Sequence, residues 1–315
     1  MIEGIWAPIL NLLTLNVLVF VMSLLGVSFF IGCYKNTFSK INSQHRKFLL
    51  WLYVLTPWFI SLLISLLFIA TGFFTADTPL NTVAHWHHKN SFELMSWHNF
   101  SLSIFIIIVC FLIIKKLKKL IKHHNEIRLL HGFSTKKHAD FYTIEAKQPS
   151  AFTCGLIKQY CFLSTGLLEK ITENEKNIIL HHELAHAQAK DPLKKWFFSF
   201  FTAFFIAPIK QYLLTNMTLA IEQEADKKVV LARYEPALIA STLVKVARLS
   251  SASPHYEMSH HFSMNLLEQR IHYLLGLQEA KPCNLLLPIS IFILFTSFTV
   301  LSIDSLHHFI ERFLN

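Results

Sequence analysis

The sequence predicts a mainly α-helical membrane protein, with four transmembrane helices and one α+β domain inserted between the third and the fourth. Two observations support this fold class. The 315-residue chain is 53% apolar and only 16% charged, whereas soluble proteins carry roughly 25% charged residues. Four stretches without a charged residue are each long enough to cross a bilayer. The same composition excludes a disordered protein, which would be poor in apolar residues.

The four predicted spans divide the chain into three regions. Residues 1–114 would hold three spans, residues 115–281 the inserted domain, and residues 282–315 the fourth span with a short tail. A cleavable signal peptide is not expected, because the first apolar stretch is too long and has no basic leader. The predicted spans are residues 5–33, 48–76, 94–114 and 283–303.

The basic residues predict the orientation of these spans. Lysine and arginine cluster after the first span and again after the third, where a lysine-rich run begins at Lys115. Because cytoplasmic loops carry the excess of positive charge, we expect 115–281 in the cytoplasm and both termini outside. The run from Lys115 to Arg128 should continue the third span as a helix. No recognition motif accompanies it, so direct nucleic-acid binding is not expected.

The strongest chemical signal is the segment from His182 to His186, which reads His-Glu-Leu-Ala-His. In a helix, residues four apart lie on one face, so both imidazoles can bind one metal ion. Glu183 lies between them and can act as a general base toward water at a zinc ion. Thr172 and Glu175 form a predicted capping box that starts this helix.

A catalytic zinc needs a third protein ligand, and an acidic segment downstream offers one. Glu222 is the candidate, on a breaker-free helical stretch at 219–232, with Glu224 as its rival. Asp226 shares a face with Glu222 and could orient a ligand histidine. Asp191 precedes Pro192, a pattern typical of a helix N-cap; orienting a histidine is its alternative role.

A fifth apolar stretch, residues 196–214, resembles a span but contains Pro208 and Lys210. If it crossed the bilayer, Glu222 would lie on the opposite side from the two histidines. We therefore expect a re-entrant or membrane-interfacial helical hairpin, bent near Pro208, that holds the site against the membrane.

The segment before the histidine motif is rich in β-formers and is broken by Gly155, which predicts short strands. The residues Phe152, Thr153, Cys154 and Gly155 could form a sheet edge that binds an extended peptide. Plain hydrophobic packing is the alternative. Cys154 is not expected to be a nucleophile, because a thiol protease would not explain the histidine motif.

A histidine-rich outer loop, residues 77–98, is a candidate metal-sensing element because imidazoles bind Zn, Cu and Ni ions. The alternative is an aromatic belt at the membrane interface with incidental histidines. The candidate ligands are His85, His87, His88 and His98.

Five motifs together resemble the BlaR/MecR-type integral-membrane metallopeptidases, which are gluzincins. They are Thr153-Cys-Gly155, Leu163-Ser-Thr-Gly-Leu-Leu168, His181-His-Glu-Leu-Ala-His186, Asp191-Pro-Leu193 and Glu222-x-x-Ala-Asp226. The four-span plan with a protease segment between spans three and four is similar too.

This resemblance implies a membrane zinc metalloendopeptidase in which His182, His186 and Glu222 bind one catalytic Zn²⁺ and Glu183 is catalytic. It also implies a bacterial cytoplasmic (inner) membrane, with the lipid bilayer and a cytoplasmic repressor-like protein as partners. The best-known members answer an outside signal by cleaving themselves or a DNA-binding repressor. Those members carry an extracellular penicillin-binding sensor domain, which we expect to be absent here because the chain ends at Asn315.

Two other functions remain open from the sequence. One is a membrane quality-control or processing protease, similar to the HtpX-like gluzincins. The other is a non-enzymatic membrane metal sensor. Many cleaved targets would favour a quality-control protease over a signalling protease, which would cleave one or two. Normal function of a Glu183→Gln variant would favour a metal sensor.

Overall fold

A computed structural model describes residues 1–33, 41–74, 91–137, 140–251 and 257–277, with a few isolated positions beyond them. Two predictions therefore lie outside the described residues. The fourth span is almost wholly outside them, and so are three of the four candidate sensing histidines, His85, His87 and His88.

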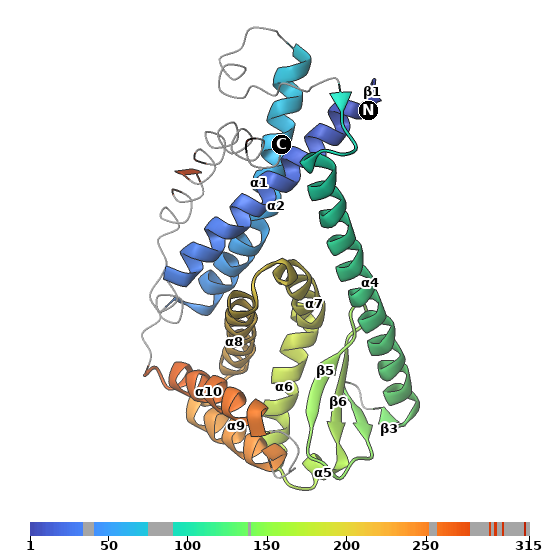
Figure 1. Ribbon diagram of the computed structural model, residues 1–315. Helices are drawn as coiled ribbons and strands as arrows, with labels where there is room; N and C mark the ends of the chain where they lie inside the picture. Colours follow the sequence, from blue (N-terminus) through green and yellow to red (C-terminus); the bar gives the residue numbers. More distant parts are fainter. Residues whose placement is uncertain are drawn as a thin grey trace.

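Three long apolar helices form the membrane part of the described chain (Figure 1). They are α1 (Trp6–Cys33), α2 (Ser43–Phe74) and α4 (Trp97–Gly132). By length and composition, each can cross a bilayer, which confirms helices at the first three predicted spans. The short strands β1 (Ile2–Glu3) and β2 (Ser91–Phe92) pair and bring the start of α1 beside the start of α4.

Helix α4 runs without a break from its apolar part into the lysine-rich run, as predicted. It thereby reaches from the α1–α2 end of the molecule to a four-stranded sheet (Figure 1). The sheet order is β3-β4-β6-β5; β4 and β6 are parallel and the other pairs antiparallel. These strands are β3 (Ser134–Lys137), β4 (Tyr142–Ile144), β5 (Ala151–Cys154) and β6 (Tyr160–Ser164).

Strand β5 is an edge of this sheet and ends at Cys154, directly before Gly155, where the sequence predicted a break. Gly155 has φ +105°, and a Cβ there would lie 1.9 Å from the carbonyl oxygen of Lys158. Only glycine fits this turn between β5 and β6.

The remaining elements are helical and pack beside the sheet (Figure 1). Helix α6 starts with the predicted capping box of Thr172 and Glu175. It lies between the sheet and α8, and α9 and α10 pack against the far end of α8. These helices are α5 (Thr165–Leu168), α6 (Glu173–Ala189), α7 (Asp191–Phe201), α8 (Ala207–Leu231), α9 (Pro236–Ser251) and α10 (Glu257–Leu274).

The fifth apolar stretch folds as a hairpin and not as a straight span. Helix α7 ends in the 3₁₀ turn η2 (Thr202–Phe204), and Pro208 stands in the first turn of α8. At the tip, the ring of Phe204 lies 5.6 Å from that of Phe20 and 5.2 Å from that of Trp58. Those two residues are near the middle of α1 and α2, so the hairpin reaches well along the apolar helices. The stretch thus folds as two helices joined by a short turn, and its re-entrant or interfacial placement at a bilayer stays a prediction.

Candidate metal centre

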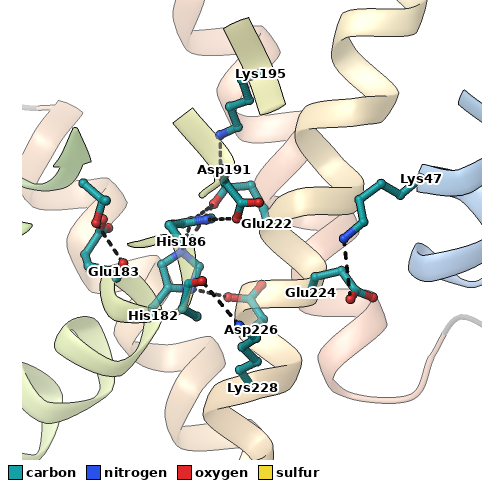
Figure 2. A network of polar contacts seen from close by, with 12 residues as sticks. Lys47, His182, Glu183, His186, Asp191, Lys195, Glu222, Glu224, Asp226 and Lys228 are labelled. Carbon is teal, nitrogen blue, oxygen red and sulfur yellow. Dashed lines mark hydrogen bonds and ion pairs between the residues drawn. The ribbon is translucent and has the colours of Figure 1, made fainter. Parts of the chain in front are cut away.

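Helix α6 places His182 and His186 one turn apart on the face that meets α8. Both side chains are buried, and their Nε2 atoms lie 3.2 Å apart. The two imidazole nitrogens are close enough to bind one cation together (Figure 2).

Helix α8 brings Glu222 to the same point. Its Oε2 atom lies 3.3 Å from His182 Nε2 and 3.6 Å from His186 Nε2. The three candidate ligand atoms all fall within 4.8 Å of one another. Among the residues that the structure describes, this is the one group of histidine, cysteine and acidic side chains arranged to hold a metal ion.

Each histidine also has a carboxylate close to its Nδ1 atom, on the other side of the ring from Nε2. Asp226 Oδ1 lies 2.9 Å from His182 Nδ1, and Asp191 Oδ2 lies 2.8 Å from His186 Nδ1. A carboxylate at Nδ1 favours the tautomer whose Nε2 lone pair is free to bind a metal. Two such histidines and one carboxylate fit a catalytic zinc site.

Asp191 does not play the N-cap role that its position before Pro192 favoured. The N-cap of α7 is Lys190, in a left-handed conformation with φ 54° and without a capping side-chain hydrogen bond. Asp191 is the first residue of the helix, and its buried carboxylate contacts His186 instead.

Glu183 is half-buried and, in the view of Figure 2, lies on the other side of the imidazoles from Glu222 and Asp226. Its carbonyl oxygen accepts a hydrogen bond of 2.8 Å from Thr153 Oγ1. This bond fixes the edge strand β5 beside the turn of α6 that carries Glu183.

Two cations that the sequence analysis did not single out reach the site. Arg270 on α10 donates from Nε and Nη2 to Asp226, both at 2.8 Å, and its Nη1 lies 3.3 Å from Glu222 Oε2. Lys195 on α7 lies 3.2 Å from Glu222 Oε1. Neither belongs to a local motif, and no spacing in the sequence relates either one to Glu222.

Opposite charges in this cluster stabilise the ionised forms of its buried side chains. Burial favours a neutral Glu222, but its contacts with the two histidines, Arg270 and Lys195 hold the pKa of its carboxyl well below the usual range. Burial likewise opposes charge on His182, yet contacts with Asp226 and Glu222 outweigh it and raise the pKa of His182 to about 9. The carboxylate ligand is therefore ionised, as binding of a metal cation requires.

Glu224, the rival ligand, points away from the site. Its Oε1 accepts a hydrogen bond of 2.5 Å from Ser43 Oγ, and its Oε2 lies 3.9 Å from Lys47 Nζ (Figure 2). Both partners belong to the start of α2, so Glu224 links α8 to that helix and is not among the three converging candidate ligands.

Of the predicted substrate edge, residues 152–154 lie in the edge strand β5 and Gly155 follows it; this strand also contributes to packing, and peptide binding there stays a prediction. Phe152 stacks on Phe162 of β6, with ring centroids 5.5 Å apart. Cys154 is buried, and burial raises the pKa of its thiol to about 11, consistent with the expectation that it is not a nucleophile.

His98 is the one candidate sensing histidine among the described residues. It lies in the first turn of α4, is buried, and stacks on Trp97 with ring centroids 4.0 Å apart. Metal sensing at the outer loop stays a prediction.

The comparison with known protein families agrees with this geometry. A sequence model of the family described as BlaR1 peptidase M56 matches residues 15–274, most of the chain. The match includes α6, the hairpin and α8, and therefore every residue of the candidate metal centre.

Proposed function

Because the chain belongs to the BlaR1 peptidase M56 family, we propose that it is a gluzincin-type zinc metalloendopeptidase of a membrane. Its substrate would be a cytoplasmic protein, either a transcriptional repressor or the chain itself, cleaved in response to an outside signal. Family membership and the three apolar helices support a membrane peptidase.

One observation carries the proposal: the Nε2 atoms of His182 and His186 and a carboxylate oxygen of Glu222 converge on one point. Asp191 hydrogen-bonds the opposite ring nitrogen of His186, and Asp226 lies 2.9 Å from that of His182, so a carboxylate adjoins each ring on the side away from the candidate ion. Two imidazoles and one carboxylate are the donor set of zinc peptidases with an open coordination position.

The residues of the chain would divide the work of peptide hydrolysis. Bound zinc supplies a Lewis acid that polarises the scissile carbonyl and makes water more acidic. Glu183, next to the first ligand, would take the proton from the attacking water and deliver it to the leaving amine nitrogen. Asp191 and Asp226 would keep the imidazoles in the correct tautomer throughout.

Strand β5 would hold the substrate as an added strand. It is an edge strand of the sheet, and Thr153 ties it directly to the carbonyl oxygen of Glu183. An extended peptide that pairs with a sheet edge is bound through its main chain, so its scissile bond lies at a defined place.

The lysine distribution supports a cytoplasmic substrate. The basic end of α4 leads directly into the sheet and the metal centre, and cytoplasmic segments carry the excess of positive charge. The bilayer and the substrate protein would then be the two partners, with no direct contact to nucleic acid.

Mapping of protein N-termini tests the proposal in cells that express the wild type or Glu183→Gln. We expect new termini in one repressor, or in this chain, only with the wild type, while the variant still binds metal. Many cleaved proteins would instead indicate a quality-control protease. Normal function of Glu183→Gln would indicate a metal sensor without catalysis.

A further inference from the structure

A cavity of about 540 Å³ lies between α4 and the α7–α8 hairpin. Four lysines line it, three from α4 and one from α7; we call it the lysine pocket. A second cavity, lined by Lys210, shares two lining residues of α8 with it and adds a fifth lysine nearby. The four lysines of the pocket are Lys116, Lys119, Lys122 and Lys195.

The positive charge of this pocket is only partly balanced. Lys122 lies 3.9 Å from Glu126, and Lys195 pairs with Glu222 of the metal centre. Within the part of the chain that the structure describes, no carboxylate lies within ion-pair distance of Lys116 or Lys119. Lys116 instead donates a short hydrogen bond to Ser199 of α7. Such a concentration of like charge favours binding of an anion.

The pocket is also partly apolar and lies near the end of the third predicted span. Its lining includes Trp196, Phe198 and Leu214 beside the lysines. Lys116 follows the last apolar residue of the third span, Ile114, by only two positions. Tryptophan and lysine side chains at the end of an apolar helix are typical of the headgroup layer of a membrane.

We propose that the lysine pocket binds the phosphodiester headgroup of an anionic phospholipid, with its acyl chains along the apolar part of α4. Basic pockets beside membrane helices are a recurrent form of such sites. An acidic protein segment would satisfy the charge as well, but it would not explain the apolar lining at the end of a span.

Lys195 connects this site with the metal centre, because it lines the pocket and contacts Glu222 at 3.2 Å. A bound phosphodiester would compete with Glu222 for Lys195. This second step rests on the proposed function, since it matters only if Glu222 is a metal ligand; lipid binding does not depend on it.

Native mass spectrometry of the full-length protein in detergent tests the lipid site by counting bound phosphatidylglycerol and phosphatidylcholine. We expect the wild type to retain phosphatidylglycerol preferentially. The double variant Lys116→Gln/Lys119→Gln should bind it about tenfold more weakly, while the charge-preserving Lys116→Arg/Lys119→Arg should bind normally. The matched control is Lys115→Gln/Lys118→Gln, which removes the same charge from exposed positions of α4 that do not line the pocket and should have little effect.

Three results would overturn the proposal. Equal losses in the Lys116/Lys119 and Lys115/Lys118 variants would mean nonspecific attraction. Release of the lipid by millimolar inorganic phosphate, with no preference between headgroups, would mean a site for free phosphate. Unchanged lipid binding, with loss of binding to a polyglutamate peptide only in Lys116→Gln/Lys119→Gln, would mean a protein-recognition site. Because each assay measures binding, a catalytically inactive protein would not obscure the answer.

Discussion

The two halves of the unbroken helix α8 have different roles, one in packing and one in the candidate metal centre. The first half packs among α1, α2 and α7, and the second half carries the acidic residues of the candidate metal centre. The buried packing residues recur every four positions: Ile209, Leu213, Met217 and Ile221. Glu222 and Asp226 follow with the same spacing on the adjoining stripe. Packing of the hairpin against the apolar helices therefore fixes which acidic side chain faces the histidines.

Glu222 and Glu224 show how the rotation of α8 decides which glutamate faces the histidines. Two residues correspond to about 200° of rotation in a helix, so their side chains lie on opposite faces. One faces the histidines of α6, and the other meets Ser43 and Lys47 of α2. A small rotation of α8 would disturb both contacts together.

The largest effect is expected from exchanging Glu222, the proposed carboxylate ligand. Glu222→Gln removes the anionic donor, so metal affinity should fall by more than about 100-fold and cleavage should be lost. Glu224→Gln makes the same chemical change two residues away and should retain one metal ion per chain. Metal content after dialysis against a weak chelator measures both, and equal loss from the two variants would contradict the assignment.

A smaller loss of metal affinity is expected from exchanging a carboxylate that contacts a candidate ligand. Asp191→Asn removes the carboxylate that fixes the ring of His186, which should weaken metal binding by about 10- to 100-fold. Competition with a zinc-binding dye gives the dissociation constant. If affinity were unchanged and only the thermal stability of the protein fell, Asp191 would be a structural residue alone.

The packing half of α8 should affect stability and leave the ligand set intact. Leu213 is fully buried, so Leu213→Ala should lower the free energy of unfolding by about 2 kcal/mol or more. Leu231→Ala changes the exposed last residue of the same helix and should cost less than about 0.5 kcal/mol. Thermal unfolding in detergent measures the difference. Loss of metal from folded Leu213→Ala would show that packing and ligation cannot be separated.

The smallest effect expected is the slow alkylation of Cys154, a buried residue that contributes to packing. Because burial raises its thiol pKa to about 11, the reactive thiolate is scarce at pH 8 and grows as the pH rises toward that value. Alkylation monitored by peptide mass spectrometry should be slow at Cys154 at pH 8 and fast at the exposed Cys33. Rapid labelling of Cys154 at pH 8 would contradict its placement.

Patterns in the sequence predicted several structural features that the described residues show. The spacing of His182 and His186 and the capping box at Thr172 depend only on helix geometry. The hairpin at 196–214 followed from one topological condition, that three ligands of one ion lie on one side of the membrane. The edge strand up to Gly155 followed from β-formers and a glycine.

Other features depend on tertiary packing, for which the sequence offers no local signal. Arg270 reaches Asp226 because α10 packs on α8, although 44 positions separate them in the chain. The Asp-Pro pair at 191–192 does begin a helix, but the left-handed Lys190 directs the Asp191 carboxylate back to His186. Glu224 could be separated from Glu222 only once α2 was known to lie against α8.

His182, His186 and Glu222 are proposed to hold one catalytic metal ion. X-ray absorption at the zinc edge of the zinc-loaded full-length protein tests this assignment most directly. We predict two imidazole nitrogens and a carboxylate oxygen around zinc, with one nitrogen lost in His186→Ala and the coordination unchanged in Glu183→Gln. A sulfur ligand, or an unchanged spectrum for His186→Ala, would contradict the account.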